Sequence, residues 1–431
     1  MVSWTRYAIV AAVAMACAMG PSTSRAAECQ LWAWGDNTRG QLGNETRSDT
    51  PVSIPVLITD GVTAVAAGSA FTIVVKNNEV WTCGDNSARQ LGYQTPSDDD
   101  YSATLQRVVI PGVLIHSVAA GSKSSFAIRD DGSWWAWGNN PGGLLGLGHT
   151  GNPVISPEQQ TSYDPFIGVK TIVAGVSHCL ALTDAGEVWS WGNNGDYGGS
   201  RNYGQLGREL SNIEIPGPVT GLDAGVTAIA AGDHHGLALT NAGKVWSWGR
   251  NDRDQLGRAT DDDLSEQSTP SLVTGLIGTV TAIAAGGNEN LAVIDGHVWG
   301  WGENSQAPHE LFDRTAFPEL AKIQTVAIGF WNETESGTLH YYYSYFALTD
   351  SGDLYAWGDN SYGQLGLGTI GTKADPSLIP EWVGSDFTSI STNGRYVLAL
   401  RGDIILSTPE PGSLGMLTLG VAYLLQRRRK L

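Results

Sequence analysis

Residues 228–251 read AIAAGDHHGLALTNAGKVWSWGRN, and this stretch is the unit from which most of the chain is built. Its glycines, its alternating apolar residues and its closing Trp-Gly-x-Asn return at 117–140, 171–194 and 282–304. The chain contains seven copies of the closing motif in all. The residue before the motif's glycine recurs at intervals of 49 to 57 residues, at Trp34, Cys83, Trp137, Trp191, Trp248, Trp301 and Trp357. Repetition at about fifty residues predicts a propeller or a solenoid.

Each unit is expected to fold as a small antiparallel sheet. Residues 226–231, 237–240 and 244–248 form three short apolar runs separated by glycine-bearing turns. Alternation along each run places side chains on the two faces of a sheet. Gly243, in Asn-Ala-Gly-Lys, supplies the positive φ of a tight hairpin turn.

Both ends of the repeated region carry incomplete units. Residues 31–37 hold the end of a unit, and residues 389–407 hold the beginning of one. Pairing them completes a blade, closes the ring and hides edge strands. The sequence therefore predicts an all-β fold, a seven-bladed β-propeller over residues 27–407 closed by pairing of its N- and C-terminal strands.

A second motif, Gly-Gln-Leu-Gly or a variant of it, follows the closing motif in five units. We expect its leucine to pack between neighbouring blades, while its glycines let the backbones approach closely. The unit around Trp301 lacks this motif and has SQAPHEL at 305–311 instead. The five copies lie at 40–43, 89–92, 204–207, 254–257 and 363–366.

These motifs, in this order, resemble the repeat of the regulator of chromosome condensation family over about residues 30–407. The resemblance implies a seven-bladed β-propeller. Family functions include nucleotide exchange on a small GTPase, and a secreted bacterial relative inhibits β-lactamase by protein contact. Both act by binding a protein surface, so the resemblance favours a binding role, although fold alone does not assign function.

The charge of the chain bears on its partners. Its 43 acidic and 25 basic residues give a formal net charge of −18. Nucleic-acid binding depends on neutralising phosphates with Lys and Arg. The charge balance therefore predicts no nucleic-acid partner.

The N-terminus has the pattern of a secretory signal peptide. Arg6 is followed by an apolar run from Tyr7 to Met19 and then by small residues. Ser24 and Ala26 are small residues at the two positions that signal peptidase reads. We expect residues 1–26 to be removed on export.

The C-terminal segment 408–431 resembles the PEP-CTERM sorting signal of Gram-negative bacteria. A Pro-Glu-Pro motif precedes an apolar run, and arginines follow this run near the chain end. The resemblance implies export, transient anchoring in the membrane through this segment, and processing by an exosortase-type enzyme. The residues of the expected signal are Pro409, Glu410, Pro411, Arg427, Arg428 and Arg429.

Two histidines occupy one repeat position. His178 and His235 stand where other units have Phe71, Ser124 and Glu289. A metal site needs several ligands that converge on one point. A histidine found at a single position, and in only some of the repeats, therefore favours packing or hydrogen bonding over a ligand or acid–base role. We predict no metal, no cofactor and no catalytic residue.

Export would leave three cysteines in the mature chain, namely Cys29, Cys83 and Cys179. Cys83 replaces the repeat tryptophan, and Cys179 lies in an apolar run. We expect both to be buried small side chains, although an oxidising compartment would permit one disulfide.

The largest departure from the repeat is an insertion of twelve residues in the sixth blade, where FWNETESGTLHYYYSY follows Gly329. Tyr and Trp carry much of the energy of recognition surfaces, so the insertion is a candidate binding site. The alternative is that these aromatics extend the hairpin and pack on one another. The candidate residues are Phe330, Trp331, Tyr341, Tyr342, Tyr343 and Tyr345.

The sequence thus favours a non-enzymatic bacterial module that is exported to the cell envelope or extracellular matrix and binds a protein or polysaccharide. A guanine-nucleotide exchange factor is the alternative that the family resemblance offers. No residue matches an exchange motif, and export would separate the chain from GTP-binding partners.

We predict that the mature protein begins at Ala27. Mass spectrometry of the protein recovered from envelope and secreted fractions should find an N-terminal peptide that starts Ala27-Glu28. Replacing Ala26 by Tyr should leave the precursor uncut, because the peptidase accepts only small side chains there. Protein found in the cytosol with Met1–Ala26 intact would contradict export and favour the exchange factor.

Overall fold

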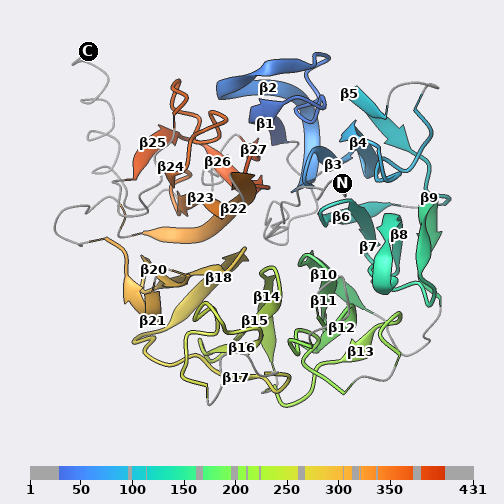
Figure 1. The fold of residues 1–431 in the computed structure, drawn as a ribbon. Helices are drawn as coiled ribbons and strands as arrows, with labels where there is room; N and C mark the ends of the chain where they lie inside the picture. Colours follow the sequence, from blue (N-terminus) through green and yellow to red (C-terminus); the bar gives the residue numbers. More distant parts are fainter. Residues whose placement is uncertain are drawn as a thin grey trace, which may run out of the picture.

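A computed structural model describes residues 29–402, except 96–99, 113, 162–167, 196–201, 210–211, 223–224, 261–266, 304, 313–319, 321, 336–337 and 372–379. In this part of the chain, strands form a ring of sheets (Figure 1). This part includes the 3-10 turn η1 (Pro141–Gly143), and no helix in it is long and apolar enough to cross a membrane. The predicted signal peptide, 1–26, and sorting segment, 408–431, lie outside the described residues.

Five sheets are four-stranded antiparallel blades whose strand order runs from the centre of the ring outward (Figure 1). They comprise β6 (Ile115–Ala120), β7 (Ser124–Arg129), β8 (Trp134–Asn140) and β9 (Gly151–Gln159); β10 (Val169–Ala174), β11 (His178–Thr183), β12 (Val188–Gly192) and β13 (Gly217–Pro218); β14 (Val226–Ala231), β15 (His235–Thr240), β16 (Val245–Gly249) and β17 (Ser271–Leu272); β18 (Val280–Gly286), β19 (Glu289–Ile294), β20 (His297–Gly302) and β21 (Ser305–Glu310); and β22 (Ile323–Glu335), β23 (Thr338–Thr349), β24 (Leu354–Gly358) and β25 (Glu381–Gly384).

The other strands form one seven-stranded sheet, so the predicted number of seven blades is wrong: the structure has five four-stranded blades and this larger sheet. The cause is β2, whose 20 residues pair with β1 in their first part and with β3 in their last, so that one strand serves two neighbouring units. The sheet contains, in order, β26 (Phe387–Thr392), β27 (Tyr396–Arg401), β1 (Cys29–Asn37), β2 (Ser48–Ala67), β3 (Phe71–Lys76), β4 (Glu79–Asp85) and β5 (Tyr101–Val108).

The two ends of the repeated region pair as predicted. β1 lies antiparallel to β27, from Gln30 opposite Arg401 to Gly35 opposite Tyr396. Residues more than 350 positions apart in the chain thereby share one sheet. The pairing closes the ring and removes two edges that would otherwise be open to other chains.

One hydrogen bond between tryptophan and main chain recurs from blade to blade. The indole Nε1 of Trp248 donates to the carbonyl oxygen of Gln205 in the preceding blade, at 3.0 Å. Trp34 donates to the Gln364 carbonyl at 2.8 Å in the same way. Three further indoles make the equivalent bond, those of Trp137, Trp191 and Trp301. Each acceptor lies in the Gly-Gln-Leu-Gly loop or its counterpart.

That loop has the packing role predicted for it. Leu206 is fully buried, as are its counterparts, and Gly207 adopts a φ of +64°. A Cβ at Gly207 would lie 2.8 Å from Nε1 of Trp248, so only glycine lets the indole approach. The asparagine of the closing motif holds the loop from its own blade: Asn251 Oδ1 accepts from the Leu256 amide at 2.9 Å.

Two positions lack the tryptophan bond. Where Cys83 replaces tryptophan, the Gln41 carbonyl accepts the Thr72 hydroxyl at 2.6 Å. Trp357 follows the unit without Gly-Gln-Leu-Gly, and its Nε1 is buried with no partner among the described residues. Its ring instead packs on Phe312 and Tyr345, with ring centroids 5.1 and 5.5 Å away.

Cys29, Cys83 and Cys179 are buried, and no disulfide joins them. Burial raises the pKa of the Cys83 and Cys179 thiols well above its usual range. Both therefore stay protonated near neutral pH and act as small apolar side chains, as the sequence predicted.

We predict that Trp248→Phe lowers the free energy of unfolding by about 2 to 4 kcal/mol, because it removes buried ring atoms and leaves the Gln205 carbonyl without its donor. Trp357→Phe removes the same atoms but no hydrogen bond, so it should cost about 1 to 2 kcal/mol less. Chemical denaturation of the two variants measures the difference. Equal losses would show that the indole N–H contributes nothing to the contact between blades.

Candidate functional site

One face of the ring carries the variable loops, and we call it the loop face. The first and third strands of a blade run in the same direction, so both end at this face. It is formed by turns such as 232–234, between β14 and β15, and by loops such as 250–253, after β16. Candidate binding groups are therefore expected where these turns and loops meet.

Main-chain hydrogen bonds join the turns of neighbouring blades around the loop face. The Ser69 amide donates to the Ser122 carbonyl at 3.1 Å, and the two hydroxyl oxygens lie 2.8 Å apart. The Asp233 amide donates to the Gly287 carbonyl at 2.9 Å. The turns thus support one another across blades and form a fixed surface.

The inserted residues lengthen the hairpin of β22 and β23 at this face. Ladder pairing continues past Gly329, which lies opposite Ser344, as far as Glu335 opposite Thr338. Alternation along the ladder sends Phe330 and Tyr343 to one side and Trp331 and Tyr342 to the other. The insertion is therefore an ordered extension of a blade.

On the first side, aromatic rings connect the hairpin to the core. Phe330 and Tyr343 have ring centroids 5.2 Å apart, and both are buried. The Tyr343 hydroxyl donates to Glu303 Oε2 at 2.8 Å. Burial raises the pKa of Tyr343 and Tyr345 well above the usual range, so both hydroxyls stay protonated. These side chains fix the base of the hairpin.

On the second side, Trp331 is covered on both faces of its ring. The Tyr342 ring stacks on it at 4.2 Å, and the Arg395 guanidinium lies 4.7 Å from its centroid. Its Nε1 donates to Asp359 Oδ2 at 2.8 Å, and only 4% of the side chain is exposed. Of the six candidate residues, only Tyr341 and Tyr342 are half-buried, and the other four are buried.

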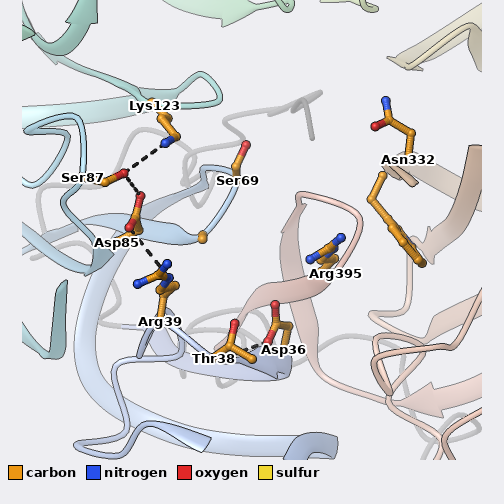
Figure 2. A pocket seen from close by; sticks show the side chains of 11 residues that line it. Asp36, Thr38, Arg39, Ser69, Asp85, Ser87, Lys123, Asn332 and Arg395 are labelled. Carbon is orange, nitrogen blue, oxygen red and sulfur yellow. Dashed lines mark hydrogen bonds and ion pairs between the residues drawn. The ribbon is translucent and has the colours of Figure 1, made fainter. Parts of the chain in front are cut away.

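A cavity of about 230 Å³ lies beside Trp331 on the loop face (Figure 2). Its charged lining comes from three neighbouring units of the ring. Figure 2 shows a chain of contacts from Lys123 to Arg39, with Arg395 across the cavity from it. The charged residues of the lining are Asp36, Arg39, Asp85, Lys123 and Arg395.

The sequence analysis did not identify this charged group. Lys123 and Arg395 occupy the repeat position of His234, immediately before the second strand. Asp36 and Asp85 occupy the variable position of Trp-Gly-x-Asn. A comparison of the positions at which the repeats differ, rather than agree, would have singled out these four residues.

A second charged group lies beyond Tyr343. Glu303 accepts the Tyr343 hydroxyl, and its Oε1 lies 3.3 Å from Nη1 of Arg253. Burial raises the pKa of Asp233 to about 7, against the opposing effect of Arg250. The loop face therefore has charged groups on both sides of the long hairpin.

The repeat histidines are structural. His178 and His235 are fully buried, and His235 Nε2 donates to Asn290 Oδ1 of the next blade at 2.7 Å. Burial lowers the pKa of His178 to about 3 and that of His235 to about 4, so both are neutral near pH 7. Within the described ranges, no three His, Cys, Asp or Glu side chains gather as metal ligands would.

Family comparison bears on the fold and the repeats. Models of the regulator of chromosome condensation (RCC1) repeat match residues 30–75, 242–293 and 351–400, and a second RCC1 repeat model matches 169–198 and 226–255. This chain is an RCC1-like β-propeller. The expected sorting-signal residues 409–411 and 427–429 lie outside the described residues.

Relatives of this RCC1-like propeller are diverse. The Ultraviolet-B receptor UVR8 of Arabidopsis thaliana is 26% identical, over 80% of this chain and 77% of the receptor. The secretion-regulating guanine nucleotide exchange factor of Bos taurus is 31% identical, over 64% of each chain. The E3 ubiquitin-protein ligase HERC2 of Homo sapiens is 27% identical over 90% of this chain, but the match spans only 8% of HERC2.

Solved structures agree with the fold. Human WBSCR16 superposes with a TM-score of 0.68 at 23% identity, covering 88% of this chain and all of that one. Prp20p from Saccharomyces cerevisiae gives 0.70 at 20% identity, covering 90% and 96%. At these identities the likeness concerns the RCC1-like propeller fold alone.

We predict that His178→Phe makes this propeller less sensitive to acid. The folded-state pKa of His178, about 3, lies below the unfolded value of 6.5, so the unfolded state binds the proton first as the pH falls. The contribution of neutral His178 to the free energy of unfolding is therefore complete above pH 6.5. It falls as the pH drops below 6.5, by about 3 kcal/mol at pH 4.5. Phe71 fills the equivalent position, so the variant should fold.

The measurement is the free energy of unfolding at pH 7 and at pH 4.5 for both proteins. The variant should lose about 3 kcal/mol less than the parent on acidification, because all other titrating groups are shared. The same loss in both proteins would show that His178 is not buried as a neutral imidazole.

Proposed function

We propose that this RCC1-like propeller is an exported, non-catalytic module that holds a protein partner on its loop face at the cell envelope or in the extracellular matrix. The observation that carries the proposal is the long β22–β23 hairpin, which is fixed on the loop face beside a charged cavity. Binding groups are commonly presented by loops on a rigid scaffold.

The hairpin is built to keep its shape without a partner. Aromatic rings support it on both sides: Phe330 and Tyr343 pack toward the core, and Trp331 lies between Tyr342 and Arg395. A surface that is already ordered loses little conformational entropy when it binds. This supports recognition by the loop face in the form that the structure shows.

A protein partner fits the aromatic geometry better than a polysaccharide. Sugar rings bind by stacking on an open aromatic face, whereas both faces of Trp331 are occupied. Charged side chains instead line the cavity beside the hairpin, and such groups are common at polar protein interfaces. A polysaccharide ligand is the alternative outcome of the binding test.

Export and anchoring are part of the proposal. The leader pattern of residues 1–26 and the Pro-Glu-Pro, apolar and arginine order of residues 408–431 support a route through the membrane with processing by an exosortase-type enzyme. This route would place the loop face outside the cytoplasm, where partners are envelope or secreted molecules.

Guanine-nucleotide exchange is the second candidate. A relative at 31% identity is named a secretion-regulating guanine nucleotide exchange factor, and the Prp20p structure is described with its binding to Gsp1p and histones. Exchange requires a GTP-binding partner in the same compartment. The location of the processed chain therefore separates the two candidates.

The binding role predicts that shortening the hairpin abolishes partner capture. Asn332 and Tyr341 lie opposite each other in the ladder, so residues 333–340 can be replaced by a two-residue Asn-Gly turn. This change keeps every aromatic candidate residue and removes only the tip. The full chain and the shortened chain would each be used to capture partners from envelope and secreted fractions.

A partner held by the full chain and lost by the shortened chain would support the proposal. Trp382→Ser, on the outer strand β25 where the side chain is 57% exposed, is the matched control and should retain the partner. Thermal unfolding would check that all three proteins are folded. Equal capture by the full and shortened chains, or none by either, would contradict a binding role for the hairpin.

A further inference from the structure

We infer that the cavity beside Trp331 is a carboxylate-binding subsite that takes an acidic side chain of the protein partner. The inference rests on the proposed function and names the chemistry that the loop face recognises. Arg39, Lys123 and Arg395 bring three cations to this cavity in a chain whose net charge is −18. With Asp36 and Asp85 in the same lining, the cavity has three cations against two anions and is locally positive on an acidic protein.

The carboxylates of the cavity already have donors. Asp85 Oδ2 accepts from Ser87 Oγ and from Gln90 Nε2, both at 2.7 Å. Asp36 Oδ1 accepts from the Thr38 amide at 2.9 Å. These bonds hold the loops that follow the third strands. The two acidic groups thus serve the architecture of the loop face.

The cations, by contrast, have donors to spare. Lys123 Nζ donates to Ser87 Oγ at 3.0 Å, and Arg39 Nε is 4.0 Å from Asp85 Oδ1. The Arg395 guanidinium makes no hydrogen bond or ion pair with any described residue. An arginine carries five N–H donors, so most of the donor capacity around the cavity is left for a ligand.

Arg395 is held in place by aromatic rings instead of by an anion. Its guanidinium carbon lies 4.7 Å from the ring centroids of both Trp331 and Tyr362. The two rings lie at 79° to each other and hold the guanidinium without using its N–H donors, and these donors match the two oxygens of a carboxylate. The long hairpin, through Trp331, thus positions a cation for binding.

The size of the cavity favours a side chain over a larger ligand. Its volume of about 230 Å³ is below the roughly 300 to 1,000 Å³ typical of pockets that enclose small molecules. A single Asp or Glu side chain fits such a space, with the rest of the partner lying on the surrounding loop face. One protein partner would therefore contact both the hairpin and the cavity.

The test titrates the full chain with the peptide acetyl-Gly-Ser-Glu-Glu-Ser-Gly-amide by isothermal titration calorimetry. Its Gln-Gln counterpart has the same size without charge and should bind at least tenfold more weakly. Affinity for the Glu peptide should fall as ionic strength rises, because salt screens the attraction. Equal binding of the two peptides, or no binding of the Glu peptide at millimolar concentration, would overturn the inference.

Two variants locate the binding. Arg395→Met and Lys123→Met should each weaken the Glu peptide at least fivefold, while methionine retains most of the packing of the stem. Arg129→Met is the matched control: Arg129 also lies over an aromatic ring, that of Trp135, but it ends β7 at the opposite end from Ser124 and the loop face. Loss of affinity in the control as large as in the two variants would overturn the site.

A third probe separates the sources of carboxylate. Oligogalacturonate that binds more tightly than the Glu peptide, with the same dependence on Arg395, would assign the cavity to an acidic polysaccharide and overturn the protein source. Failure of all carboxylate probes, with the hairpin-dependent partner still captured, would refute the subsite and leave the binding face intact. If the carboxylate probes do not bind and no hairpin-dependent partner is captured, the proposed function is refuted as well.

Discussion

The hydrogen bond from a buried tryptophan indole to a carbonyl of the preceding blade is the constraint on which the ring depends. It needs an indole at a fixed place, a glycine that lets the ring approach, and an asparagine that holds the accepting loop, as in Trp248, Gly207 and Asn194. Each requirement appears in the repeat as Trp-Gly-x-Asn or Gly-Gln-Leu-Gly. The repeat therefore largely reflects how the blades bind one another, because an unpaired buried indole, or a bulkier residue in place of the glycine, lowers stability.

One of the two positions that lack this bond, Trp357, is also the place where the chain adds new structure. The unit around Trp301 has lost the accepting loop, and the indole of Trp357 is left without a partner among the described residues. Aromatic packing takes over: Tyr345 stacks on Trp357, Tyr343 on Tyr345, and Phe330 lies against Tyr343. The cluster that replaces the missing contact between blades is continuous with the base of the long hairpin. Stability and presentation of the hairpin therefore depend on the same rings.

The sequence could predict what repeats and could not predict what happens between repeats. Hairpin turns at glycines such as Gly243, the packing of Leu206 and the pairing of β1 with β27 all follow from local patterns that recur. The sequence did not predict that β2 joins two units into one sheet. How far a strand extends depends on which other strands lie beside it to pair with, and a local pattern does not show this. The sequence left open whether Trp331 is exposed or packed, because Arg395, which covers it, comes from the turn between β26 and β27 of another blade.

The acidic character of the chain sharpens the selectivity of its loop face. At a distance, a net charge of −18 repels polyanions, and screening over about 8 Å at physiological ionic strength limits this repulsion to the neighbourhood of the surface. A carboxylate that reaches the cavity meets Arg39, Lys123 and Arg395 at close range, where hydrogen bonds and exclusion of water outweigh the more distant charges. Attraction then depends on shape and not on charge alone. A flexible acidic polymer gains little from such a surface, whereas a folded partner that places one acidic side chain beside the hairpin gains the contact without bringing many negative charges near the acidic body.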